Sequence, residues 1–122
     1  MAYMDKNNPI AQITKEFALR ILKLSGYLVE EKKEYVLSKQ LLRSGTSIGA
    51  NIRESIYAQS KADFISKLSI ALKESSETEY WLELLHESNY LSDTEYESIY
   101  NDNSKISATL INIIKKSKTS ME

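Results

Sequence analysis

Side chains that are apolar in all cases but one recur at steps of three and four residues, or at sums of these steps, along four stretches of the chain. An α-helix has about 3.6 residues per turn, so this spacing places the apolar side chains on one face of each helix. The pattern therefore predicts four amphipathic helices. The residues of the four stretches are Ile10, Ile13, Phe17, Ile21, Leu24 and Leu28; Leu37, Leu41, Ile48, Ile52 and Ile56; Ile65, Leu68, Leu72, Leu82 and Leu85; and Tyr96, Ile99, Asn103, Ile106, Leu110 and Ile113.

Capping signals mark where these helices begin. Asn8 followed by Pro9 fits an N-cap and a first helical position. Ser60–Asp63 and Ser92–Glu95 both have the spacing of a capping box. The helices are predicted at about residues 8–29, 35–57, 61–87 and 93–115, with a solvated tail at 116–122.

The length and the short joints between helices indicate the fold class. A chain of 122 residues has the usual size of one domain. Joints of only a few residues make consecutive helices antiparallel neighbours. We therefore predict an all-α fold, a single domain over residues 1–122 built as an antiparallel up-and-down four-helix bundle.

Composition limits the expected cellular location of the protein and the kinds of site that it can contain. The chain has no Cys, which excludes disulfides and thiolate metal sites. It has no apolar run of roughly 20 residues and no signal-peptide pattern at its start, so we expect a cytoplasmic protein without a membrane partner. The net charge of -1 argues against a strongly basic nucleic-acid binder.

Charge is nevertheless unevenly distributed. No Lys or Arg occurs between Lys73 and Lys105, a stretch that holds nine acidic residues. The simpler interpretation is a solvated charged surface. The alternative is that a basic face binds an acidic face of a neighbouring copy, or binds phosphate. The cations that could contact nucleic acid are Lys15, Arg20, Lys23, Lys32, Lys33, Lys39 and Arg53.

The turn between the second and third helices, near Gln59, allows contacts across that hairpin to be predicted. Arg43 should lie beside Glu74 and Glu77, which are neighbours on one helix face. We interpret this group mainly as a structural ion-pair clasp that fixes helix register, and less readily as a ligand-binding carboxylate pair. On the same reasoning, Glu54 should face Lys61 or Lys67.

Small residues on these two helices predict a close helix–helix seam. Gly45 and Gly49 lie one turn apart, and each should cost roughly 0.5 to 1 kcal/mol relative to Ala inside a helix. The hairpin register places Gly49 opposite Ser69. We therefore expect Gly45, Gly49 and Ser69 to form a narrow seam between the second and third helices.

No pattern of an enzyme active site was found. Glu83 and His86 have the Glu-x-x-His spacing of di-iron bundles, but such a site needs a second copy of the motif and His86 is the only histidine. Serines without a nearby base and glycines without a phosphate-loop ending support neither hydrolysis nor nucleotide chemistry. We expect no enzyme activity and no cofactor. The alternative hypothesis is a carboxylate metal or small-ligand site around Glu74, Glu77, Glu83 and His86.

Three stretches of the chain carry a resemblance to a known family. They are RSGTSIGANIRE at 43–54, SKADF at 60–64 and LSIALKESSETEYWL at 68–82. Together they resemble the four-helix bundle proteins encoded by intervening sequences in bacterial 23S ribosomal RNA genes. The family's characteristic polar positions, none with a known catalytic role, would fall on Arg43, Ser47, Asn51, Glu54, Glu74, Glu77 and Trp81.

This resemblance implies an up-and-down bundle that assembles as a five-fold ring in a bacterial cytoplasm. The accessory variability proteins of diversity-generating retroelements look like more distant relatives, and those basic rings associate with reverse transcriptase and nucleic acid. The present chain differs in its acidic balance. The leading hypothesis is a non-enzymatic homo-oligomeric scaffold, a pentameric ring, that contacts RNA or a nucleic-acid enzyme through its first two helices.

Overall fold

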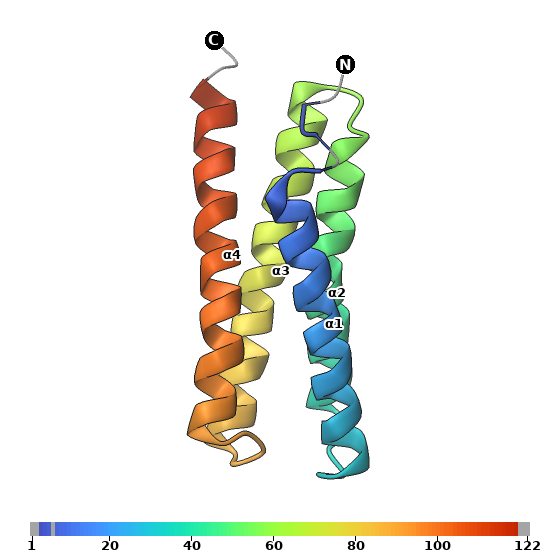
Figure 1. Ribbon diagram of the computed structural model, residues 1–122, viewed down its shortest axis with the longest axis vertical. Helices are drawn as coiled ribbons and strands as arrows, with labels where there is room; N and C mark the ends of the chain where they lie inside the picture. Colours follow the sequence, from blue (N-terminus) through green and yellow to red (C-terminus); the bar gives the residue numbers. More distant parts are fainter. Residues whose placement is uncertain (1–2, 6, 120–122) are drawn as a thin grey trace.

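The computed structural model describes residues 3–5 and 7–119, which fold into four long α-helices (Figure 1). They run alternately up and down, and both ends of the chain lie at the same end of the bundle. Each helix packs on the next in the chain, and α1 also packs on α4 over a much smaller contact. The predicted all-α up-and-down bundle is confirmed. The helices are α1 (Pro9–Glu30), α2 (Leu37–Ile56), α3 (Lys61–Glu87) and α4 (Asp93–Thr119).

The helix ends agree with the predicted bounds except at the C-terminus. α4 continues to Thr119, so the predicted solvated tail is wrong for residues 116–119. Ile114 is buried, which keeps the last turns of α4 packed on the bundle, and Lys116 and Lys118 in the last turn suit the negative end of the helix dipole. The rest of the predicted tail, residues 120–122, lies outside the described residues.

The three predicted N-terminal caps are confirmed. The side chain of Asn8 accepts a hydrogen bond from the backbone N–H of Ile10 at 2.9 Å. Ser60 Oγ accepts from the N–H of Asp63 at 3.0 Å, and Ser92 Oγ accepts from the N–H of Glu95 at 3.1 Å. These contacts satisfy helix N–H groups that have no partner within the helix.

The start of α2 is held by a residue that sequence reasoning missed. Glu34 lies in the joint between α1 and α2 and is buried. Its carboxylate accepts hydrogen bonds from the backbone N–H groups of Val36, Leu37 and Ser38, at 3.2, 3.0 and 2.7 Å. A carboxylate at a helix N-terminus is favoured by both the free N–H groups and the helix dipole.

The buried residues largely follow the predicted apolar helix faces, but some helices are rotated slightly about their axes. Ile13 was predicted to be buried but is 45% exposed, while Thr14 beside it is fully buried. In α4, Ile114 rather than Ile113 is buried. Among the described residues, no helix is long and apolar enough to cross a membrane.

Buried polar pairs link the helices within this core. The hydroxyls of Ser44 on α2 and Thr78 on α3 lie 2.9 Å apart. Between α3 and α4, the Ser75 hydroxyl donates to Asn103 Oδ1 at 2.8 Å. The Asn103 amide in turn donates to the Ser75 carbonyl at 2.9 Å. Among the described residues, no buried side-chain nitrogen or oxygen lacks a hydrogen-bond partner.

The two glycines of α2 form a close contact with α1, so the predicted seam with α3 is wrong. A Cβ atom on Gly45 would lie 2.8 Å from Cγ1 and Cγ2 of Ile21. A Cβ atom on Gly49 would lie 3.2 Å from the backbone oxygen of Thr14. Both contacts belong to α1, whereas Ser69, the third residue of the predicted seam, lies on α3. The hairpin register predicts which residues lie at the same height along α2 and α3. It does not predict the direction in which each side chain points.

We predict opposite effects for alanine at two helical glycines. Gly45→Ala should lower the free energy of unfolding by about 1 to 2 kcal/mol, because overpacking against Ile21 outweighs the gain in helix propensity. Gly26→Ala should raise it by about 0.5 to 1 kcal/mol, because a Cβ there meets no atom within 4 Å. Urea denaturation of both variants at one protein concentration measures the difference. Equal stabilities would contradict the close contact.

We also predict that Glu34 makes stability depend on acid pH. Burial alone would raise the pKa of the Glu34 carboxyl, but backbone hydrogen bonds from Leu37, Ser38 and Val36 outweigh it and hold the pKa below the ordinary 4.5. The ionised form therefore stabilises the fold above the unfolded-state pKa. This stabilisation is lost as pH falls through the lower, folded-state pKa.

Glu34→Gln should lower the free energy of unfolding at neutral pH by about 1 to 2 kcal/mol and flatten its decline below pH 4.5. Denaturant titrations at a series of pH values measure both effects. Glu31→Gln, an exposed change in the same joint, is the control. A decline as steep in Glu34→Gln as in the parent chain would show that another group titrates.

Candidate functional site

The polar residues singled out by the family resemblance lie on one side of the α2–α3 hairpin. On α2 they follow steps of four, four and three residues, and on α3 steps of three and four, so each set occupies one side of its helix. All seven are exposed or half-buried. We call this surface the polar strip; it consists of Arg43, Ser47, Asn51, Glu54, Glu74, Glu77 and Trp81.

The predicted clasp lies towards one end of the polar strip, next to Trp81. Arg43 Nη1 lies 3.1 Å from Glu74 Oε2, and Nη2 donates to Glu77 Oε1. The indole N–H of Trp81 donates to the same oxygen of Glu77 at 3.2 Å. The hydrogen bond from Arg43 lowers the pKa of Glu77 and raises that of Arg43. Half of the Arg43 side chain is exposed, so the clasp lies at the surface and not in the core.

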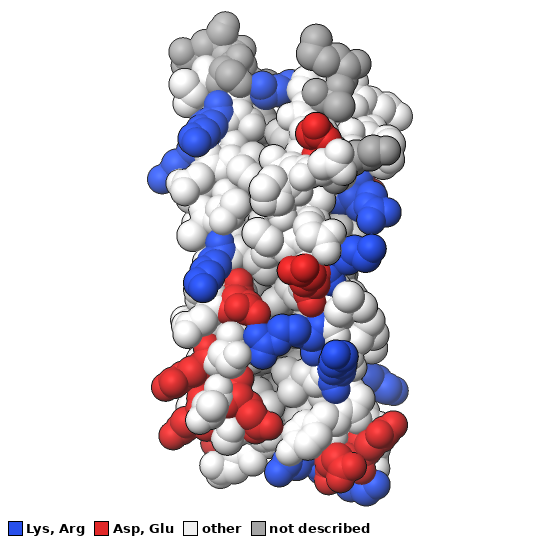
Figure 2. All heavy atoms as spheres, viewed as in Figure 1, with Lys and Arg blue, Asp and Glu red and all other residues white. Residues whose placement is uncertain are grey.

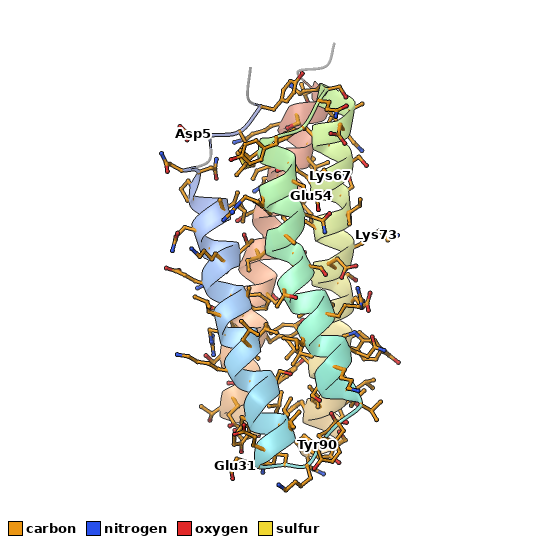
Figure 3. All side chains as sticks on the ribbon, turned by 90° about the vertical axis from the view of Figure 1, so that its right-hand side faces the viewer. Asp5, Glu31, Glu54, Lys67, Lys73 and Tyr90 are labelled. Carbon is orange, nitrogen blue, oxygen red and sulfur yellow. The ribbon has the colours of Figure 1, made fainter. Side chains whose placement is uncertain are left out.

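The rest of the polar strip is also paired within the hairpin. Asn51 donates to the backbone oxygen of Ser47 at 2.9 Å. Glu54 Oε1 lies 3.4 Å from Lys67 Nζ, and Figure 3 shows the two side chains at the junction of α2 and α3. The prediction for Glu54 is thus confirmed with Lys67 as the partner. Of these two pairings, only the one between Glu54 and Lys67 joins α2 to α3.

The residues of the hypothesised carboxylate metal or ligand site do not lie close together in the structure. Glu74 and Glu77 bind Arg43 on the α2 side of α3. His86 lies on the α4 side, where its Nε2 is 2.7 Å from Asp93 Oδ1 and its ring stacks on Tyr96 at 4.1 Å. Within the part of the chain that the structure describes, no three His, Cys, Asp or Glu residues are arranged to hold a metal ion. The predicted grouping of these four side chains is wrong.

The seven cations predicted to contact nucleic acid are all exposed but do not form one patch. Arg20 is paired with Asp102 of α4 at 2.6 Å, and Lys32 lies over the ring of Tyr27 at 5.9 Å. Lys15 and Arg53 line a groove between α1 and α2. In Figure 2, acidic side chains gather over the lower part of α4 and basic ones lie on α1 beside it.

Two surface grooves were not predicted from the sequence. One, of about 260 Å³, follows the outer side of α1 and α2 and has a floor of small residues that includes Ala18, Gly49 and Ala50. The other, of about 340 Å³, lies between α1 and α4, where Ile13 and Phe17 face Ile106. The available signal for the first groove was the pair Ala11 and Ala18, two turns apart on α1, together with Gly49 and Ala50 on α2.

The sequence of the chain matches a known protein family over most of its length. A family model described as 23S rRNA-intervening sequence protein matches residues 6–112. The chain belongs to this family. The region matched contains the whole polar strip and all but the last residues of α4.

A solved structure is similar to this family member over most of its length. It is a crystal structure of a protein of unknown function from the S23 ribosomal protein family of Bacteroides thetaiotaomicron. The sequences are 60% identical, the match covers 87% of this chain and 98% of the other, and the TM-score is 0.86. Among curated proteins, none matches the chain.

We predict a small energetic role for the clasp because it is exposed. Arg43→Ala should lower the free energy of unfolding by about 0.5 to 1 kcal/mol, less than a buried ion pair would cost. A double-mutant cycle with Glu77→Gln, measured by urea denaturation, should give a coupling energy of similar size. Lys39→Ala, an exposed change on the same helix, is the control. A coupling energy of zero would mean that the ion pair does not stabilise the hairpin.

Proposed function

We propose that this protein is a non-enzymatic homo-oligomeric scaffold of the cytoplasm, assembled as a five-fold ring, that contacts RNA through exposed cations of α1 and α2. The family description, which refers to intervening sequences of 23S rRNA, supports a setting close to ribosomal RNA. The five-fold symmetry is suggested by the resemblance described above. The assembly and the RNA contact are separate parts of the proposal, and each has its own support.

The observation that best supports the proposed assembly is the exposed apolar surface of α1. Leu19 is 51% exposed and Leu22 is 50% exposed, one turn apart on a helix whose other side is fully packed in the core. Ala18 and Ala11 extend this surface along the helix. An exposed apolar surface of this kind, bordered by charged residues, is typical of protein–protein contacts.

The RNA contact is supported by the exposure of the cations at the α1–α2 end of the bundle. Lys32 and Lys33 lie in the joint between the helices, and Lys39 lies in the first turns of α2. All three are exposed. In a ring, these three lysines would be repeated in every subunit, so many separate cations could contact phosphate although the net charge of the chain is -1 and the exposed Glu30 and Glu31 lie beside the same joint.

The pairing within the polar strip supports a scaffold more than an enzyme. Arg43, Glu74 and Glu77 bind one another, and Asn51 binds its own helix. His86 is bound to Asp93 and stacked on Tyr96. Polar groups engaged in this way fix the arrangement of helices and leave little capacity to bind and convert a substrate.

Size-exclusion chromatography with light scattering tests both parts of the proposal. At low salt, we expect a protein mass of about five times 14.0 kDa with nucleic acid in the same peak, and release of the nucleic acid as salt is raised. A triple variant, Lys32→Gln, Lys33→Gln and Lys39→Gln, should keep the protein mass and lose most of the nucleic acid. The matched control replaces the exposed residues Lys105, Lys115 and Lys116 of α4 by Gln.

The outcomes separate the two parts. A monomer at all concentrations would contradict the scaffold. An oligomer that carries no nucleic acid, or equal loss of nucleic acid in the variant and the control, would contradict the RNA contact through α1 and α2. Ribonuclease and deoxyribonuclease digestion of the peak identifies which nucleic acid is bound.

A further inference from the structure

The outward side of α2 is turned away from the core over the whole length of the helix. Exposed or half-buried residues recur along it at steps of three and four, so they form one row opposite the buried Leu41, Ile48 and Ile52. In Figure 3, α2 runs along the front of the bundle from the joint near Glu31 to the turn beyond Glu54. We call this surface the α2 ridge; it consists of Lys39, Arg43, Thr46, Ala50, Arg53 and Tyr57.

The α2 ridge is positively charged. It carries three cations and no acidic residue. Arg43 is held in the clasp, but within the described part of the chain Lys39 and Arg53 have no ion-pair or hydrogen-bond partner. The acidic residue of α2, Glu54, is paired with Lys67 at 3.4 Å. Two free cations thus lie on one side of one helix, about 21 Å apart at 1.5 Å per residue.

Exposed tyrosines lie at both ends of the α2 ridge. Tyr57 ends it and is 72% exposed, and Tyr35, in the joint just before α2, is 54% exposed. Among the residues that the structure describes, neither ring contacts another aromatic ring or a cation. Aromatic rings stabilise a fold or an interface mainly by being covered. These two rings therefore offer flat apolar faces to a partner.

Free cations between exposed aromatic rings match the chemistry of an unpaired nucleic-acid strand. Its phosphates bind cations, and its bases stack on aromatic rings whatever the base sequence. A duplex matches this surface less well, because its bases are stacked on one another and the major groove of an RNA duplex is too deep and narrow for side chains to read. The joint lysines, Lys32 and Lys33, extend the positive charge beyond Tyr35.

We infer that the α2 ridge binds a single strand of RNA, with bases stacked on Tyr35 and Tyr57 and phosphates bound by Lys39 and Arg53. The distance from Tyr35 to Tyr57 is about 33 Å at 1.5 Å per residue, which suits about ten nucleotides at about 3.4 Å each. This inference rests on the proposed RNA contact and assigns it a path and a type of RNA.

Fluorescence anisotropy with a labelled oligouridylate of about 15 nucleotides tests the inference on the full chain, freed of nucleic acid by nuclease and high salt. Tyr57→Ala should weaken binding at least about fivefold, because one stacking surface is lost, and should leave the dependence of affinity on salt unchanged. Arg53→Gln should weaken binding and also make the slope of log affinity against log salt less steep by about 0.7, the value for one lost phosphate contact to a single strand.

A second probe tests the preference for an unpaired strand. The same oligouridylate annealed to oligoadenylate should bind about fivefold more weakly than the single strand, because its bases are not available for stacking.

Matched controls change exposed residues of the same types on α3. Tyr80→Ala removes a ring that is 54% exposed, and Lys73→Gln removes an exposed cation. Both variants should bind the single strand like the parent chain. Circular dichroism and light scattering should give the parent helix content and mass for every variant.

The outcomes separate this inference from the proposed function. Weaker binding in Tyr57→Ala and Arg53→Gln, with unchanged controls, supports the α2 ridge. If the parent chain binds the strand and both variants bind it equally well, the ridge is wrong and the contact through the joint lysines is left intact. Equal binding of duplex and single strand also overturns the inference.

Two further outcomes count against it. Variants that lose their assembly together with the RNA would assign the α2 ridge to the contact between subunits. A parent chain that binds neither probe overturns this inference together with the RNA part of the proposed function.

Discussion

The register of four long helices is the constraint on which the surface of this protein depends. Amphipathic helices gain most of their stability by burying apolar side chains, and this gain changes little when one helix slides along another by a turn. Polar groups in the core oppose such sliding, because it would break the hydrogen bonds that they make between helices and would leave the buried Asn103 amide without its partners on α3. Ser44 with Thr78 joins α2 to α3, and Ser75 with Asn103 joins α3 to α4.

The register of the helices in the core determines which surface side chains of adjacent helices lie side by side. With Thr78 held against Ser44, Arg43 reaches Glu74 and Glu77, and Glu54 reaches Lys67. The exposed ion pairs contribute little energy themselves, but they agree with the arrangement that the buried pairs impose. The polar strip is therefore best understood as the outer edge of a well-fixed α2–α3 hairpin, with α1 held close by the contact of Gly45 with Ile21.

This rigid frame leaves two sides of the bundle for interactions. The outer side of α1 and α2 is apolar and basic, and the outer side of α3 and α4 is aromatic and acidic towards its lower end. The lysines of the α1–α2 joint lie at one end of the bundle, apart from the groove.

The sequence by itself determined the helices, their caps and their heights relative to one another. Periodicity and capping are local, so they are readable along the chain, and the short turn near Gln59 was sufficient to predict Arg43 beside Glu74 and Glu77. It did not determine the rotation of each helix about its axis, which is why Gly45 and Gly49 were assigned to α3 instead of α1. It also missed Glu34, whose charged neighbours in the sequence concealed a buried cap.

Only the tertiary structure decided which sides of the helices remain open, because that depends on the packing of all four at once. It separated Glu74 and Glu77 from His86, placing them on two sides of α3, and so excluded the grouping that their spacing in sequence had suggested. It also left Leu19 and Leu22 exposed beside a groove that no single helix defines. A sequence specifies which residues share a helix face, whereas the packing of neighbouring helices decides whether that face is core or surface.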